Sequence, residues 1–346
     1  MGVGAMPRSC RDSQRAKAGA AVVALLVAIA CPNPAMCQPE TDAGRDPAMQ
    51  PGDRRGAPAL FRSELAAPDT LGVGRVAASV ADELPAVEAL TKELNQRIAG
   101  LGYARALPVI ARDNAEMIEF LRDGTVDIVS QTPLSAIHFV ARAGASILLG
   151  ERHNGSATYS AVVFVREDSP VRTLADLRGR RMAFENRGST AAFLLPLVAL
   201  RRADIPAQLL EGPTNDVRPE AIGYFFAQSK KSIVSAVTRR AADAGAISDE
   251  DWRELRRSEP DIAAVLRPVH VSEDIPRAFV VVGPKVSGPQ REALKRVLQQ
   301  LEKDAASREI LRRYDDVDGF DPVDDELEHQ IENLEATYAL VSEEMD

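Results

Sequence analysis

Hydrophobic and polar positions alternate along the chain in two different periods, which predicts a succession of strands and helices. Short apolar runs typical of buried strands occur at 71–77, 107–111, 126–129 and 146–149. Between them, apolar residues recur every three or four positions, as Val87, Leu90 and Leu94 do in a segment that two glycines end. Strands that alternate with helices build mostly parallel sheets, so this region predicts an α/β lobe.

The same alternation restarts after a strongly apolar strand at 159–165. Further elements are expected as a short helix at 174–179, a strand at 181–184, a helix at 232–240, a strand at 244–247 and a helix that carries Trp252. A second apolar run at 278–283 mirrors the one at 159–165. The pattern therefore predicts two lobes, each a mostly parallel sheet flanked by helices, joined by two crossover strands about which the lobes can move.

These patterns also set the expected boundaries. Lobe 1 is expected at 69–166 and 275–320, lobe 2 at 167–274, and an acidic C-terminal helix at 321–346. Residues 38–68 are rich in Pro, Gly, Asp and Arg without apolar periodicity, which indicates a flexible linker.

The first 37 residues form a segment of their own. Basic residues from Arg8 to Lys17 precede an apolar run at 18–30, and prolines follow at once, as in a secretory signal peptide. The run is short for a membrane span, which needs about 20 residues. Two outcomes stay open: cleavage after Cys37, or lipid attachment at Cys31. We therefore expect a periplasmic or otherwise extracytoplasmic protein, attached to the membrane only through such a lipid.

Composition narrows the classes of function. A chain of 346 residues with 45% hydrophobic residues is long enough for two domains with their own cores. The net charge of −9 disfavours binding to nucleic acid or to anionic membranes, so an anion must be attracted by local groups. All three cysteines precede residue 38, and the rest of the chain has no disulfide framework and no thiolate metal site.

The segment 183–196, AFENRGSTAAFLLP, is a candidate anion site. A strand that feeds a helix here leaves the first N–H groups of the helix unpaired, at the positive end of its dipole. Ser189 and Thr190 add hydroxyl groups, Gly188 permits close approach, and Arg187 adds a guanidinium. The alternative is that Ser189 only caps its own helix.

Four segments in this chain resemble one family of proteins. They are DIVSQTPLSA at 127–136, LADLRGRRMAF at 174–184, GST at 188–190 with Pro196, and DAGAIS at 243–248. Together they resemble the phosphate, phosphite and phosphonate periplasmic binding proteins of ABC transporters, over about residues 71–320. The resemblance implies a type II periplasmic binding protein fold whose lobes close over an oxyanion, held by a Ser-Thr-Ser helix start, without a cofactor.

The resemblance also implies a set of ligand-binding residues. Ser189 and Thr190 match the helix start, whereas Ala191 replaces its second serine. Ser130 stands where the family has a tyrosine, and Lys230 stands at a basic or histidine position, although a solvated pair with its neighbour explains this lysine equally well. The complete expected set is Ser130, Gln131, Thr132, Gly188, Ser189, Thr190, Ala191, Lys230, Ser248 and Asp249. The last two lie at a strand end, where ligands collect in α/β sheets.

The sequence offers little for an enzyme. Its four histidines have no metal-ligand spacing, and no nucleophile elbow, Walker loop or dinucleotide motif follows a strand. The acidic stretch 315–325 has its glycine at the wrong place for an EF-hand. We expect no catalytic residues and no metal site.

The expected function is an exported solute-binding protein that captures a small oxyanion between its lobes and delivers it to an ABC permease. The alternative is an exported sensor that presents its bound state to a membrane receptor or a histidine kinase, with the acidic tail helix as a docking element. The residues do not choose between these two roles, nor among phosphate, phosphite and phosphonates.

Overall fold

The computed structural model describes residues 69–77 and 79–345, and within this part the chain folds into two α/β lobes. The signal peptide and the linker expected before residue 69 lie outside the described residues. None of the described helices has the length and apolar character that a membrane crossing requires.

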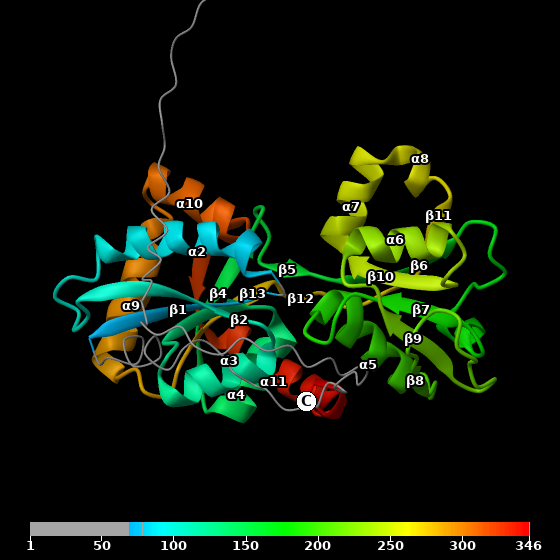
Figure 1. The fold of residues 1–346 in the computed structure, drawn as a ribbon, viewed down its shortest axis with the longest axis horizontal. Coiled ribbons are helices and arrows are strands. Elements are labelled where there is room, and N and C mark those ends of the chain that lie inside the picture. Colours follow the sequence, from blue (N-terminus) through cyan, green and yellow to red (C-terminus); the bar gives the residue numbers. More distant parts are fainter. Residues whose placement is uncertain (1–68, 78, 346) are drawn as a thin grey trace, which may run out of the picture. The chain divides into compact units, whose positions relative to one another are not determined.

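Lobe 1 is built on a six-stranded sheet in the order β14-β4-β13-β3-β1-β2 (Figure 1). Its strands are β1 (Thr70–Val76), β2 (Arg105–Ala111), β3 (Ile128–Gln131), β4 (Ser146–His153), β13 (Ala278–Val282) and β14 (Val317–Pro322). The strand β1 is parallel to β2 and β3, and β4 runs in the same direction because both β3 and β4 are antiparallel to β13. Only β13 and β14 run the other way.

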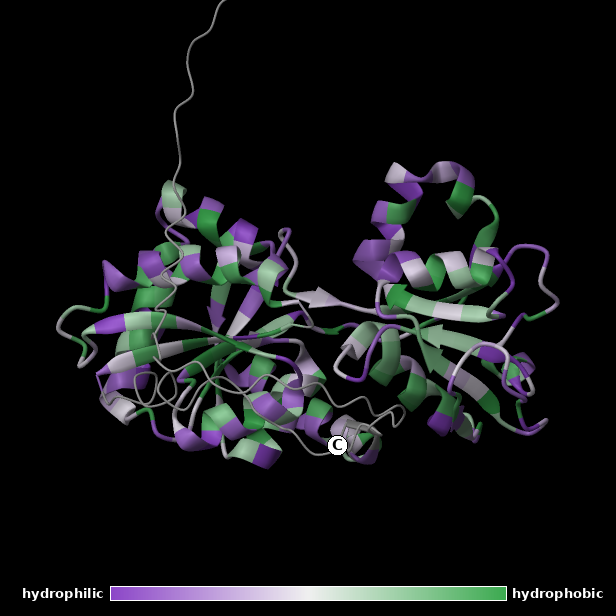
Figure 2. Ribbon diagram, in the orientation of Figure 1, coloured by the Kyte–Doolittle hydropathy of each residue, from purple (hydrophilic) through white to green (hydrophobic). Residues whose placement is uncertain are grey.

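Helices cover both faces of this sheet because each face carries apolar side chains. The helices α2 (Val80–Asn95), α9 (Gly288–Leu301) and α10 (Ala305–Asp315) contribute to one core cluster. The helices α3 (Asn114–Asp123), α4 (Pro133–Ala143) and α11 (Asp325–Tyr338) contribute to another. Figure 2 shows hydrophobic colouring along the strands, while hydrophilic positions gather on the helices and loops.

Lobe 2 has a second six-stranded sheet in the order β11-β6-β10-β7-β9-β8. Its strands are β6 (Ala161–Arg166), β7 (Arg181–Phe184), β8 (Ala207–Leu209), β9 (Ile222–Phe226), β10 (Ala244–Ser248) and β11 (Leu266–Val271). The strands β8, β9, β7 and β10 are parallel to one another, and only β6 runs against the rest. The flanking helical segments are η1 (Leu174–Leu177), η2 (Thr190–Leu194), α5 (Leu195–Arg202), α6 (Lys230–Thr238), α7 (Asp249–Ser258) and α8 (Pro260–Ala263).

The chain passes between the lobes through a small antiparallel pair, β5 (Thr158–Tyr159) and β12 (Ile275–Pro276). The strand β6 lies beyond this crossing, although the sequence pattern placed residues up to 166 in lobe 1. It belongs to the second sheet because it pairs with β10 on one side and β11 on the other. The two-lobed α/β architecture itself is confirmed. The two apolar runs predicted as crossover strands mostly form the sheet strands β6 and β13, and the crossing pair β5 and β12 lies at the start of the first run and just before the second.

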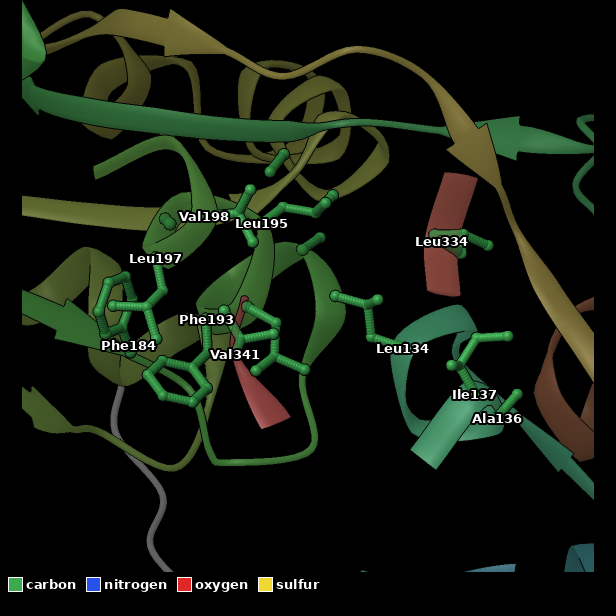
Figure 3. Packing of buried hydrophobic residues seen from close by; sticks show 14 of the residues in the cluster. Leu134, Ala136, Ile137, Phe184, Phe193, Leu195, Leu197, Val198, Leu334 and Val341 are labelled. Carbon is green, nitrogen blue, oxygen red and sulfur yellow. The ribbon is translucent and has the colours of Figure 1, made fainter. Parts of the chain in front are cut away.

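One hydrophobic cluster contains residues of both lobes and of the C-terminal segment. Leu134 comes from α4 in lobe 1, Phe193 from η2 in lobe 2, and Leu334 from α11. Figure 3 shows Leu134 on the side of α4 that faces the segment carrying Phe193. This shared core brings the start of α4 close to the start of η2.

Candidate functional site

The turn after β7 presents a capped helix start. The chain leaves β7 at Phe184, and Ser189 is the N-cap of η2, accepting a hydrogen bond from Ala192 N at 3.2 Å. The segment η2 is a π-helical turn that continues directly into α5. The ring of Phe184 packs edge-on against Phe193 at 5.2 Å, which holds the strand end and the helix start together. Ser189 therefore does cap its own helix, as the simpler interpretation expected.

A second helix start, from lobe 1, meets this turn. The helix α4 follows β3, with Thr132 as N-cap and Pro133 in its first turn. Leu134 N donates a hydrogen bond to Thr190 Oγ1 at 3.3 Å. Gly188 O accepts one from Ser135 Oγ at 3.0 Å and one from Thr132 Oγ1 at 3.3 Å.

This convergence has an electrostatic consequence. Each helix N-terminus carries roughly half a unit of positive charge, from N–H groups that have no acceptor within the helix. Two such ends meet between the lobes, where Thr190 is fully buried and water contributes little screening. The place where the two helices face each other is therefore suited to a small anion.

The crossover pair adds two polar side chains to this place. Tyr159, at the end of β5, is 4% exposed, and its hydroxyl has no hydrogen-bond partner within the described residues. The Arg277 guanidinium lies over the Tyr159 ring at 4.7 Å, and its Nε is likewise buried without a partner. Burial raises the pKa of Tyr159 to about 12. Arg277 and the Thr190 side chain, which lies beside the phenol, act to lower this pKa.

Glu185 and Asp249 supply carboxylates near the same place. Burial raises the pKa of Glu185, while the Ser189 hydroxyl and Lys230 act in the opposite direction. Asp249 Oδ1 accepts from Ser160 N at 3.1 Å, and its other oxygen accepts from Arg253 at 2.7 Å. Burial thus favours the protonated form of Glu185, which can donate to an oxyanion, whereas the ionised form repels one.

The expected site residues divide into three groups. Thr132, Gly188, Ser189 and Thr190 are together at the junction of the two helix starts, with Ala191 buried in the next position and Gln131 just before the turn. Ser130 instead points into lobe 1, where its hydroxyl donates to Glu151 at 2.8 Å. This contact gives Ser130 a structural explanation, and its role in binding stays a prediction.

Lys230 and Ser248 are engaged with α7. The Lys230 ammonium lies 2.6 Å from Asp251 Oδ1. The negative charge of Asp251 offsets the positive charge that Lys230 would present to an anion. Ser248 accepts from Asp251 N at 3.0 Å and caps α7. Their contacts to a ligand also stay predictions.

Tyr159, Arg277 and Glu185 were not among the residues expected from the sequence. A weak signal was available: a tyrosine and an arginine stand at or just before the two apolar crossover runs, where a polar side chain has no purpose in strand packing. Their approach to Thr190 depends on the pairing of β5 with β12, which no local pattern reveals.

Metal chemistry has no support within the described residues, since no group of three or more His, Cys, Asp or Glu side chains is arranged to hold an ion. The buried His153 bonds to Glu151 at 3.1 Å inside lobe 1.

Residues 78–327 match the family described as "ABC transporter, phosphonate, periplasmic substrate-binding protein". Because the match spans most of the chain, this protein belongs to that family. The family comprises solute-binding proteins of ABC transporters that act in the periplasm and are not enzymes.

Solved structures agree with this assignment. XAC2383 from Xanthomonas citri is 29% identical in a structure bound to chloride and 28% identical in one bound to ATP, with TM-scores of 0.76 and 0.75. Each alignment covers 80% of this chain, and 99% and 100% of the other chain, respectively. PhnD1 from Prochlorococcus marinus, in complex with methylphosphonate, is 17% identical with a TM-score of 0.62, covering 80% of this chain and 99% of the other, which shows a shared fold.

Proposed function

We propose that this protein captures a small phosphorus oxyanion between its lobes, at the junction of the starts of α4 and η2. The observation that carries this proposal is the hydrogen bond from Leu134 N to Thr190 Oγ1, because it places two helix N-termini at one point. The buried hydroxyl of Tyr159, beside Thr190, adds a further polar group at this place.

Capture involves movement of the lobes about β5 and β12. Contacts between Gly188 and the start of α4 join the lobes, so an anion held by both helix starts favours the closed arrangement over the open one. The bound anion then stabilises closure by the difference between its affinities for the two arrangements. The binding cycle ends when the anion is released, and no covalent bond is made or broken in it.

We infer delivery to an ABC permease as the physiological role, with export by the N-terminal signal peptide, followed either by cleavage after Cys37 or by lipid attachment at Cys31. The family membership supports this role. A sensor role on the same fold remains the second candidate. Permease and ATPase genes beside the gene for this chain support transport, whereas a receptor or kinase gene in that position supports sensing.

Two classes of ligand carry the phosphorus oxyanion: small phosphonates and phosphate esters with a large substituent. Methylphosphonate is the ligand of PhnD1, and ATP is bound to XAC2383, to which this chain has greater identity. A phosphate ester with a large substituent offers the same terminal oxygens to the helix starts as a small phosphonate does. The shared chemistry is a terminal phosphoryl or phosphonyl group.

Isothermal titration of the purified protein tests the proposal. Phosphate, phosphite, methylphosphonate, 2-aminoethylphosphonate and ATP form the panel, with acetate and chloride as control anions. Saturable binding of at least one phosphorus oxyanion, without comparable binding of the controls, supports the proposal. Equal or absent binding across the whole panel contradicts it.

A further inference from the structure

The helix α11 is fixed to lobe 1 along most of its length. It follows β14, which pairs with β4 at one edge of the lobe 1 sheet. Near its end, Tyr338 Oη lies 2.9 Å from Nδ1 of His138, a buried residue of α4. Leu334 is 2% exposed and packs in the core cluster to which α4 contributes. Because of these contacts, α11 moves with lobe 1 whenever the lobes move.

The chain that follows α11 reaches lobe 2. Backbone bonds from Leu340 N and Val341 N to carbonyl groups of α11, at 3.1 and 2.9 Å, continue the helical turn past Tyr338. Leu340 O then accepts a hydrogen bond from Nη1 of Arg201, in α5. Val341 is fully buried in the cluster that also contains Leu197 of α5 (Figure 3). The end of a lobe 1 helix is therefore bound to a lobe 2 helix.

This contact lies beside the crossover between the lobes. The helices α5 and α11 and the segment 270–276, which runs into β12, line one groove of about 940 Å³. Val198 lines it from α5, and Leu334 and Leu340 line it from α11 or just beyond. Unlike the crossover strands, the connection between α11 and α5 consists of a hydrogen bond and apolar packing, so it can break and form again.

Two contacts between the lobes belong to the same core. Leu134 at the start of α4 and Phe193 of η2 share their cluster with Val341. The helix α11 is bound to α4, and α5 continues directly from η2. A rotation that draws the start of α4 away from η2 therefore also draws α11 away from α5. Such a rotation exposes Val341 to water, which costs free energy.

We propose that α11 with residues 339–341, the C-terminal strap, favours the closed arrangement of the lobes and thereby sets the affinity of the interlobe site without touching the ligand. Its effect on affinity rests on the proposed function, whereas its effect on the spacing of the lobes does not. When the binding-competent arrangement is less populated, the apparent Kd rises by the same proportion for every ligand. A lost ligand contact, in contrast, changes the Kd by a factor that depends on the anion.

One double variant and two matched controls test the strap. In Val341→Ala/Arg201→Ala, the strap loses buried apolar volume and the donor to Leu340 O. Arg202→Ala removes the neighbouring positive charge of α5 and keeps the bond from Arg201 to the strap. Val282→Ala truncates a fully buried valine of β13 in the other core cluster of lobe 1, so it controls for a loss of stability that does not involve the strap.

Small-angle X-ray scattering measures the spacing of the lobes, and calorimetry with phosphate and methylphosphonate measures affinity. Melting temperatures verify folding. Without an anion, the double variant should have a larger radius of gyration than the unmodified protein, and a saturating anion that binds should remove the difference. We expect its Kd to rise about threefold or more, by the same factor for each anion that binds, while the controls stay within about twofold.

The results separate the strap from the proposed function. A radius of gyration in the double variant that equals the unmodified value, without an anion, overturns the strap. A Kd that rises for one anion and not for another also overturns it, because a strap acts on all anions alike. If the unmodified protein binds neither anion, the proposed function fails for this panel and scattering alone decides on the strap. Should the double variant not fold, Arg201→Ala alone takes its place.

Discussion

Leu134 N and Thr190 Oγ1 are joined by a 3.3 Å hydrogen bond that links the first turn of a lobe 1 helix to the first turn of a lobe 2 helix. The two residues are 56 positions apart in the chain. Both are fully buried, so the bond lies in an environment of low dielectric where dipoles act strongly. The proposed site derives its attraction for anions from this meeting of two helix ends.

Removing the Thr190 hydroxyl should weaken anion binding. In Thr190→Val the shape is nearly kept, but a hydroxyl beside the anion is lost and Leu134 N loses its acceptor. We expect an increase in ΔG of binding of about 1–3 kcal/mol, by the usual cost of leaving a charged acceptor short of a donor. Calorimetry with methylphosphonate measures the effect, and unchanged affinity would remove Thr190 from the site.

Glu185 should make anion binding depend on pH. Burial raises the pKa of Glu185, so its carboxyl group ionises at a higher pH than an exposed glutamate does. As pH rises through this raised pKa, the group ionises, ceases to donate and repels the anion. The ratio of the Kd of the unmodified protein to that of Glu185→Gln, measured from pH 5 to 8, should therefore rise with pH.

Taking this ratio at each pH cancels the ionisation of the ligand itself. A ratio that does not change with pH would show that Glu185 does not titrate in contact with the anion.

Asp127 should give lobe 1 a different pH dependence. Burial raises the pKa of Asp127 to about 6, although Gly72 N donates to its carboxylate at 2.7 Å. The folded state thus holds the proton more tightly than the unfolded state, and stability falls as pH rises from about 4 to about 6. A shift of this size corresponds to at most roughly 3 kcal/mol.

The variant Asp127→Asn lacks this titration. Denaturant unfolding at pH 4.5 and 7.5 should show the variant gaining stability relative to the unmodified protein at the higher pH. A difference in unfolding free energy that is the same at both pH values would contradict the assignment.

The C-terminal helix should contribute to stability through its buried face. Leu334 of α11 is 2% exposed and belongs to the core shared by α4 and η2, and Tyr338 Oη lies 2.9 Å from His138. Leu334→Ala should lower the unfolding free energy by roughly 2–5 kcal/mol. Leu340→Ala, at a position 39% exposed, is the matched control and should change it by less than about 0.5 kcal/mol. Equal losses in the two variants would show that the contact is unimportant.

The sequence pattern predicted most elements because their apolar periods are local properties. The strand β7 was predicted at its observed bounds, and the helix start at Ser189 follows from a strand, a polar turn and a hydroxyl residue in succession. The strands β8 and β14 were not predicted, because β8 has three residues and β14 carries glycine and aspartate instead of a continuous apolar run. The strand β9 was also missed, although its sequence IGYFF is an apolar run.

Only the part of the site whose residues are adjacent in sequence was predicted as a group. Gly188, Ser189 and Thr190 adjoin one another in sequence, so their grouping needs no tertiary information. The approach of Thr132 and Ser135 to Gly188, and of Arg277 to Tyr159, arises from lobe packing and strand register. The contacts of Ser130 with Glu151 and of Lys230 with Asp251 likewise depend on side chains distant in sequence.

The melting temperature of the purified protein with and without phosphorus anions tests the central claim most directly. The series uses millimolar phosphate, phosphite, methylphosphonate, 2-aminoethylphosphonate and ATP, with sulfate and acetate as controls, on the unmodified protein and on Thr190→Val. A micromolar ligand at a thousandfold excess adds about 4 kcal/mol to stability, which is a shift of several degrees. The account predicts such a shift for a phosphorus anion, reduced in Thr190→Val. Melting temperatures that no anion changes, or that change equally in both proteins, would contradict it.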